Sequence, residues 1–323
     1  MKERATIEQI AERIKRAKSV VIFTHMRPDG DALGCSLALS FALDRLGIEH
    51  VVCDESPLPS NLSFMRGLER IQKTVSIDAD LYIALDSADS ARLGALSETF
   101  ERAMKKRIDT VNIDHHISNP HYAKMNYVRT CSANCMNVAK LIDALGVALD
   151  KEIAESLLAG LLTDSGNFSH DDVDEECFLL ASRLVKAGAD IRSLTYNLFK
   201  KQPKERASLH AEVMSKIRYF HDDKLAVITI SLDAMARHHA DNGMTEGFVD
   251  FPLNVDTVEV AASIMEVKQG QYKISLRSKT YADVNRVAGV YGGGGHVRAA
   301  GCMLFGELEE IIDKLSYTVS QYL

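Results

Sequence analysis

The sequence SVVIFTHMRPDGDALG, residues 19–34, decides the fold class of this chain. Its opening run, residues 19–23, is β-branched and apolar, as expected of a strand that is buried on both faces. After the turn-forming residues 28–30, apolar residues recur at helical spacing over 32–46, and Gly47 follows as a helix terminator. A buried strand that leads through a turn into a helix is the repeating unit of parallel α/β sheets.

The same alternation continues to about residue 170. Further strands are predicted at 50–53, 81–85 and 110–113, and helices at 93–106, 135–145 and 151–162. Strands alternating with helices predict an α/β domain with a mostly parallel sheet that is covered on both faces.

The pattern changes after a further helical stretch at 174–188. The polar, basic segment 199–206 is the best linker candidate. Strand-like runs then occupy 224–231, 257–267 and 272–277, and a helical stretch, a four-glycine run, a short strand at 302–305 and a final helix from Glu307 follow. We therefore predict a first domain at 1–198, a helical linker at 199–221 and a smaller α+β domain at 222–323.

Composition limits the classes of protein that this chain can represent. The 323 residues exceed what one compact core usually holds, and 46% hydrophobic with 26% charged residues is typical of globular protein. A formal charge of −7 argues against a binder of long duplex DNA, although a local basic pocket for a small phosphorylated ligand is compatible with it. No apolar run approaches the ~20 residues of a membrane span, and residues 1–18 do not resemble a signal peptide, so we expect a cytoplasmic protein.

The six cysteines are scattered and include no CxxC pair, which favours reduced, mostly buried thiols. Cys131 and Cys135 have the spacing to share a helix face, but we do not predict a thiolate metal site there.

Acidic and histidine residues gather where the predicted elements end. They are His25, Asp29 and Asp31 after the first strand, Asp86 after residues 81–85, Asp114, His115 and His116 after residues 110–113, and Asp164 after residues 151–162. Each has an ordinary alternative: a loop cap, a turn residue, a surface or core histidine, or an N-cap in the case of Asp164. Ligands of open α/β sheets bind at the carboxyl ends of the strands. Because the acidic and histidine residues after three predicted strands all lie at such ends, we predict that the set forms one functional site at that edge of the sheet rather than separate caps and turns.

Five carboxylates crowded beside three histidines cannot all stay ionised unless positive charge lies nearby, and the chain offers little there beyond Arg27 and Arg92. Divalent metal would resolve the repulsion. Carboxylate and imidazole ligands without thiolate favour manganese, and magnesium, iron or cobalt less decisively. So many ligands indicate two ions that share a carboxylate, the usual device for displacement at phosphorus.

The second domain carries the stretches SLRSK, residues 275–279, and YGGGGHVRAAG, residues 291–301. Consecutive glycines let the backbone approach a ligand and point amides at an anion, although glycines alone could form a flexible hairpin tip. With basic side chains close by, phosphate recognition is the better interpretation. The candidate substrate-binding residues are Arg277, Ser278, Gly293, Gly294, Gly295, His296 and Arg298.

HMRPDGDALG, ALDSAD, NIDHH and TDSGNF resemble the four ordered motifs of the DHH phosphoesterase superfamily, and SLRSK with GGGGHVRAAG resembles its DHH-associated C-terminal domain. The resemblance covers about residues 19–305, and the compact two-domain form is similar to the NrnA-like group of bifunctional oligoribonucleases and 3′-phosphoadenosine 5′-phosphate (pAp) phosphatases.

This resemblance implies a role for each position. His25 and Asp29 would hold one manganese ion, Asp31, His115 and Asp164 a second, and Asp86 would bridge the two. Asp114 would orient a neighbouring ligand. His116 would face the scissile phosphate, and the residues of the second domain would hold the substrate's other phosphate or terminal nucleotide.

The implied reaction is attack of a metal-bridging hydroxide on phosphorus. It would convert pAp to AMP and phosphate, and short RNA or linear dinucleotides to nucleoside 5′-monophosphates, while the second domain closes over the cleft. Magnesium or cobalt could replace manganese. The implied partners are short RNA and pAp, and binding to long duplex DNA or to a membrane is not expected. A homodimer is possible.

Two alternatives differ in what they require of the chain. A single-strand exonuclease of the RecJ type shares the DHH motifs but would need further nucleic-acid-binding domains. A non-catalytic nucleotide-binding regulator would be favoured by a missing Asp86 or DHH histidine, and neither is missing.

Overall fold

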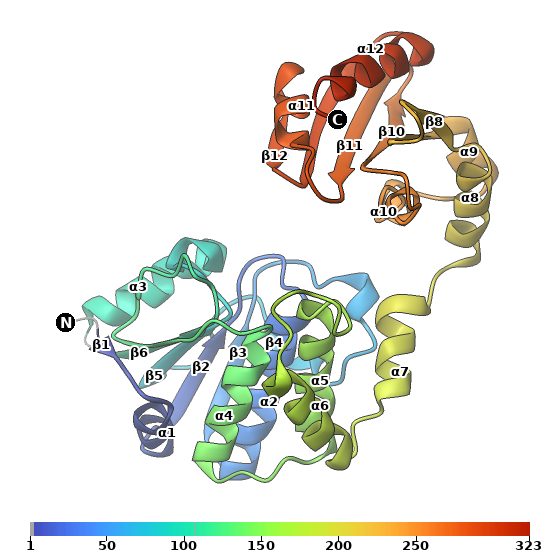
Figure 1. Ribbon diagram of the computed structural model, residues 1–323. Helices are drawn as coiled ribbons and strands as arrows, with labels where there is room; N and C mark the ends of the chain where they lie inside the picture. The colour runs from blue at the N-terminus through green and yellow to red at the C-terminus, as the bar shows by residue number, and fades with distance from the viewer. Residues whose placement is uncertain (1–2, 107) are drawn as a thin grey trace. The chain divides into compact units, whose positions relative to one another are not determined.

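The computed structural model describes residues 3–106 and 108–323 (Figure 1). They form two compact units that divide between Lys201 and Gln202, and each is described separately. None of the described helices is long and apolar enough to cross a membrane.

The first unit is built on a seven-stranded sheet in the order β1-β7-β6-β5-β2-β3-β4, and every described pairing in it is parallel. Its strands are β1 (Glu3–Arg4), β2 (Ser19–Phe23), β3 (Glu49–Cys53), β4 (Ile71–Gln72), β5 (Leu81–Leu85), β6 (Asp109–Asp114) and β7 (Met125–Val128). The predicted α/β class is confirmed, and β2 and β5 have the predicted bounds. The very short β1 and β4, and β7, were not predicted.

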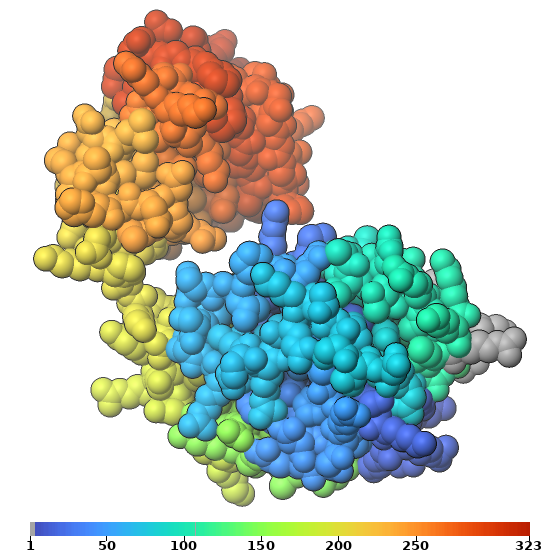
Figure 2. All heavy atoms as spheres, turned by 180° about the vertical axis from the view of Figure 1, so that it is seen from behind, coloured from blue at the N-terminus to red at the C-terminus, as the bar shows by residue number. Residues whose placement is uncertain are grey.

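The helices of the first unit are α1 (Ile7–Lys15), α2 (Gly30–Leu46), α3 (Ser97–Lys105), α4 (Asn134–Leu145), α5 (Lys151–Asp164), α6 (Glu175–Lys186) and α7 (Ile191–Thr195), with short 3₁₀ or π turns η1 (Ser60–Leu62), η2 (Leu68–Arg70), η3 (Ser90–Leu96) and η4 (Tyr196–Lys200). From behind, the surface of this unit includes the long segment between β3 and α3, coloured light blue to cyan (Figure 2).

Strand β2 shows why both faces of the sheet are covered. Val20 and Ile22 point into a core shared with α1, α2, α4 and α5, whereas Val21 and Phe23 point into a second core with α3. All of these side chains are fully buried, which explains the continuous apolar run in the sequence.

The second unit holds a six-stranded mixed sheet in the order β12-β13-β11-β10-β9-β8, in which only β9 and β10 pair in parallel among the described strands. The strands are β8 (Arg218–Phe220), β9 (Leu225–Ile230), β10 (Val260–Lys268), β11 (Gln271–Ser278), β12 (Gly294–His296) and β13 (Ala299–Phe305). The helices are α8 (Lys204–Met214), α9 (Leu232–Arg237), η5 (Asn242–Thr245), α10 (Asp250–Leu253), α11 (Val284–Val290) and α12 (Leu308–Ser320).

Helices cover both faces of this second sheet as well. Helices α11 and α12 pack on one side, and α8 and α9 on the other, where Leu209 and Val213 of α8 join the core. The proposed linker at 199–221 thus overlaps the first helix of the second unit. Part of the four-glycine run forms strand β12 rather than a free hairpin tip.

Candidate metal centre

The predicted site residues of the first unit meet at the carboxyl ends of β2, β5 and β6. His25 follows β2, Asp86 directly follows β5, and Asp114 ends β6. Strand β2 lies between β3 and β5, so the chain order reverses beside it. Such a switch point is where open α/β sheets bind ligands.

One group of potential ligands consists of His25, Asp29 and Asp86. Nε2 of His25 lies 3.7 Å from a carboxylate oxygen of Asp29 and 3.7 Å from one of Asp86. Nδ1 of His25 lies 3.0 Å from the carbonyl oxygen of Met26, which turns Nε2 toward the carboxylates. Asp29 is also the N-cap of α2, where its side chain accepts the amides of Asp31 and Ala32.

A second group consists of Asp31, His115 and Asp164. Nε2 of His115 lies 3.6 Å from a carboxylate oxygen of Asp164 and 3.4 Å from one of Asp86. Its Nδ1 is 2.9 Å from the carbonyl oxygen of Cys131, so again Nε2 faces the acids. Asp164 is the last residue of α5, and the alternative that it is an N-cap is therefore wrong.

Asp86 lies between the two groups, and its position is unusual in two ways. Its backbone has a left-handed φ of 53°, which a non-glycine residue rarely adopts and which is common at functional sites. Its Oδ1 is buried, and within the described residues it is the one buried side-chain oxygen or nitrogen without a hydrogen-bond partner. Such an atom is costly unless a cation satisfies it, so the residues present fit a bound metal ion.

The electrostatics of the cluster agree with this fit. Burial and the charge of Asp86 raise the pKa of Asp31 to about 7, and burial with the charges of Asp31 and Asp86 raises that of Asp164 to about 9. Burial alone would lower the pKa of His115. The hydrogen bond and charge of Asp86, together with the charge of Asp31, outweigh burial and raise this pKa to about 10. Without a cation, the cluster therefore retains protons that divalent metal would displace.

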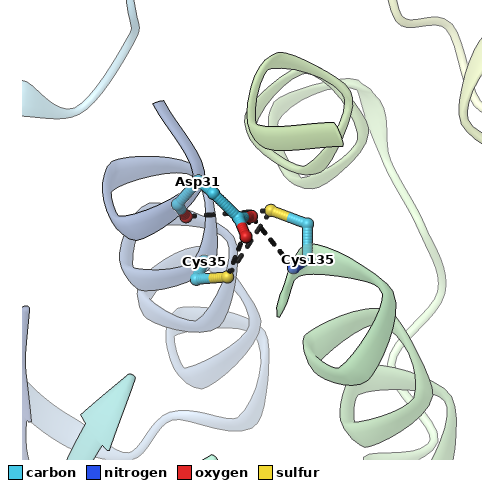
Figure 3. A group of neighbouring side chains, drawn as sticks. All are labelled: Asp31, Cys35 and Cys135. Carbon is cyan, nitrogen blue, oxygen red and sulfur yellow. Dashed lines mark hydrogen bonds between the residues drawn. The ribbon is translucent and has the colours of Figure 1, made fainter. Parts of the chain in front are cut away.

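Asp31 also belongs to a buried group with Cys35 and Cys135, drawn in Figure 3. Its carboxylate accepts hydrogen bonds from the amides of Asn134 and Cys135 and so caps α4 from outside. The two sulfur atoms are 3.5 Å apart, and all six cysteines are free thiols. Cys131 precedes α4, so it does not share a helix face with Cys135.

Asp114 and His116 form a pair beside the metal ligands. Nδ1 of His116 is 2.8 Å from Oδ1 of Asp114, and Nδ2 of Asn119 donates to Oδ2 of Asp114 at 2.6 Å. Arg92 of η3 donates to Nε2 of His116 at 3.4 Å. Within the described residues, the guanidinium of Arg92 has no carboxylate within salt-bridge distance.

The sequence does not predict that Arg92 and Asn119 support Asp114 and His116. It shows Arg92 only as a nearby positive charge and assigns no role to Asn119. The asparagine that closely follows the DHH motif in NIDHHISN was the available signal, because a buried carboxylate needs donors around it.

The candidate substrate residues of the second unit lie where β11, β12 and β13 adjoin. His296 is exposed, and Arg277 forms an ion pair with Asp250 at 3.4 Å. Two predicted residues bond within the protein instead: the hydroxyl of Ser278 donates to the carbonyl of Ala282 at 2.7 Å, and Arg298 donates to the same carbonyl at 2.9 Å.

Two of the glycines at 293–295, Gly293 and Gly295, serve close backbone packing. A Cβ at Gly293 would lie 2.2 Å from the carbonyl oxygen of Gly301, and one at Gly295 2.4 Å from that of Ala299. The run thus lets β12 approach β13, and the amide of Gly295 is already bound by the side chain of Asn285 at 2.8 Å.

Comparison with known proteins agrees with these features. Residues 19–161 match the N-terminal domain of the DHH family, and residues 222–321 match the DHHA1 domain. The bifunctional oligoribonuclease and PAP phosphatase NrnA of Thermus thermophilus is 31% identical over 97% of this chain and 93% of its own length.

Solved structures show the same architecture. An exopolyphosphatase-related protein from Bacteroides fragilis has a TM-score of 0.82 at 26% identity, covering 98% of this chain and 96% of its own. The exonuclease RecJ bound to manganese is similar in fold alone, with a TM-score of 0.52 at 16% identity, over 99% of this chain and 94% of its own. The chain is thus a member of the DHH superfamily and, within it, an NrnA-like protein.

Proposed function

We propose that this protein is a phosphoesterase that hydrolyses short RNA oligonucleotides, including linear dinucleotides, to nucleoside 5′-monophosphates, and pAp to AMP and phosphate. Relatives named as oligoribonuclease and PAP phosphatase that align over nearly the whole chain support this proposal, as do both matched domains.

We propose further that two divalent ions, manganese by preference, are its cofactors. The observation that carries this is the buried Oδ1 of Asp86, which has no hydrogen-bond partner within the described residues. The two oxygens of this carboxylate face different histidines: Oδ1 lies 3.4 Å from Nε2 of His115, and Oδ2 lies 3.7 Å from Nε2 of His25. His25 and Asp29 would hold one ion, Asp31, His115 and Asp164 the other, and Asp86 both. Mixed carboxylate and imidazole donors suit manganese.

When bound, the ions would lower the pKa of a nucleophilic water and offset charge on the phosphoryl oxygens. The chain's own groups complete the site. Asp114 accepts Nδ1–H of His116 and fixes its ring, while Nε2 accepts a hydrogen bond from Arg92. A protonated His116 would turn Nε2–H toward the leaving oxygen in place of that hydrogen bond, and would stabilise or protonate it. Arg92, a cation without a carboxylate partner in the described part of the chain, would bind the phosphoryl oxygens beside it.

In the second unit, Arg277, His296 and the backbone of Gly293–Gly295 would hold the other phosphate or terminal nucleotide. Ser278 and Arg298 would act indirectly, because their polar atoms hold the loop that follows β11. In this proposal 1–198 is the catalytic domain and 222–323 the substrate-binding domain. The segment 199–221 joins them, and its α8 and β8 pack with the second unit.

The test is hydrolysis by metal-stripped protein after manganese is restored. The substrates are pAp, a 5′-labelled RNA dimer and pentamer, an RNA 30-mer and pyrophosphate. Asp86→Ala should abolish turnover, whereas Asp313→Ala, an exposed aspartate of α12, should not. Metal analysis should give two ions per chain.

Preference for the 30-mer would favour the RecJ-type alternative, and tight binding of pAp without turnover would favour a non-catalytic regulator. Full activity after metal removal would refute the metal assignment.

A further inference from the structure

The loop of residues 279–282, between β11 and α11, is held by a buried carboxylate. Glu259, only 5% exposed, accepts hydrogen bonds through Oε1 from the amides of Thr280, Tyr281 and Ala282 at 3.0, 2.7 and 2.8 Å. Its Oε2 accepts the hydroxyl of Thr280 at 2.6 Å. Three successive amides converging on one carboxylate fix the backbone of this loop.

The carbonyl groups of the same loop are also bound. Ser278 and Arg298 both donate to the carbonyl of Ala282, and Arg298 donates in addition to the carbonyl of Thr280. The guanidinium of Arg298 thus donates hydrogen bonds to the residues on either side of Tyr281. The loop is rigid before any ligand binds.

This rigid loop presents an aromatic side chain to solvent. The side chain of Tyr281 is 54% exposed, and within the described residues no ring stacks on it and no group hydrogen-bonds its hydroxyl. The hydrogen bonds of Glu259 and Arg298 fix the backbone on both sides of Tyr281, while about half of this residue stays open to solvent. An aromatic ring held in place by its backbone binds a flat ligand with little loss of conformational entropy.

The position of Tyr281 indicates the ligand. Arg298 connects its loop to the turn that follows the glycine run, and residues Arg277 and Ser278 lead directly into it. We propose that Tyr281 forms a nucleobase subsite, on which the base of the nucleotide held by Arg277 and the glycine loop stacks. This inference rests on the proposed function. It adds a group that binds the base, which the residues proposed to bind phosphate do not contact.

Stacking predicts a dependence on the aromatic face and not on the hydroxyl. Base–aromatic stacking is worth ~1–3 kcal/mol on replacement by alanine, or roughly 5- to 150-fold in affinity. Tyr281→Ala should therefore raise KM for pAp by about tenfold with little change in kcat, and Tyr281→Phe should leave both unchanged. Tyr317→Ala, which removes a 71% exposed tyrosine of α12, is the matched control.

The decisive measurement compares calorimetric binding of AMP with that of ribose 5-phosphate to the manganese-loaded full chain. Tyr281→Ala should weaken AMP binding about tenfold and leave ribose 5-phosphate unaffected. The subsite would be overturned if Tyr281→Ala left KM for pAp unchanged, or if it weakened the binding of AMP and of ribose 5-phosphate equally. If Tyr281→Ala unfolds, Tyr281→Leu, which keeps bulk without a π-face, gives the same test. Because the wild-type protein must hydrolyse pAp in these assays, failure of the subsite is distinguishable from failure of the proposed function.

Discussion

Asp31 of α2 accepts a hydrogen bond from the backbone amide of Cys135 at 3.0 Å, so a residue of one helix caps the first turn of another. The positive end of the α4 dipole then faces the carboxylate and partly offsets the rise that burial and Asp86 cause in the pKa of Asp31. Because Asp31 is also a proposed metal ligand, the packing of α2, α4 and α5 sets the position of that ligand.

Gly160 on α5 is the residue that permits this packing. A Cβ there would lie 2.4 Å from the sulfur of Cys135 and 2.7 Å from Oδ1 of Asp31. We expect Gly160→Ala to cost about 1–3 kcal/mol in unfolding free energy and to weaken manganese binding. The control is Gly289→Ala in α11, where a Cβ meets nothing within 4 Å. Calorimetric titration with manganese checks the prediction, and wild-type affinity in the Gly160 variant would contradict it.

Asp86→Asn should separate metal binding from folding. The carboxylate of Asp86 repels Asp31 and Asp164 but attracts His115, so the loss of its charge has opposing effects on the metal-free fold. Because asparagine also tolerates the left-handed backbone, the metal-free variant should melt within a few degrees of wild type. The rise in Tm that manganese gives the wild type should largely vanish. Asp222→Asn, an exposed aspartate with the same φ of 53°, should change neither. If manganese raises the Tm of the variant as much as that of wild type, Asp86 is not a metal ligand.

Asn119 should affect turnover through Asp114. Asn119→Ala removes the donor at 2.6 Å from Oδ2 of Asp114 and loosens the support of His116, so kcat should fall about 10- to 100-fold with KM little changed. Steady-state kinetics on pAp, with Tm measured alongside, check this. Exposed Asn254→Ala is the control. A rise in KM at constant kcat would show that Asn119 acts on the substrate instead.

Asp250 competes for the guanidinium that is proposed to bind phosphate. Its Oδ1 lies 3.4 Å from Nε of Arg277, and both side chains are partly exposed. Since such pairs are worth up to about 1 kcal/mol, Asp250→Asn should lower KM for pAp by up to about fivefold. Glu309→Gln, which breaks the exposed pair with Arg218, should have no effect. An increase in KM would mean that Asp250 orients Arg277 for binding.

Glu259 should make the second unit sensitive to acid. Burial would raise its pKa, but hydrogen bonds from Ala282, Thr280 and Tyr281 outweigh burial and hold the pKa below its usual range. A carboxyl with a lowered folded-state pKa contributes stability above its unfolded pKa of about 4.3, and this stability is lost as the pH falls through the folded value.

Thermal unfolding of the full chain from pH 6 to 3 tests this dependence. Stability should fall less steeply in Glu259→Gln than in wild type, whereas Glu307→Gln, at an exposed site, should follow wild type. Parallel pH profiles for wild type and Glu259→Gln would remove Glu259 as the cause.

The sequence by itself determined the α/β class, the bounds of β2 and β5 and the meeting of His25, Asp86, Asp114 and His115 at one edge of the sheet. It could do so because buried strands have a periodicity that local sequence displays, and because parallel strands end at a common edge. The order of the motifs also identified the superfamily.

Only the tertiary structure decided which partners those residues find. Asp31 caps a helix more than 100 positions later in the chain. Ser278 and Arg298 donate hydrogen bonds to a loop of the protein instead of to a ligand. The sequence assigns no role to Glu259 or Tyr281, because neither belongs to a motif. A hydrogen bond between distant segments depends on how helices and strands pack, and local sequence carries no signal of that packing.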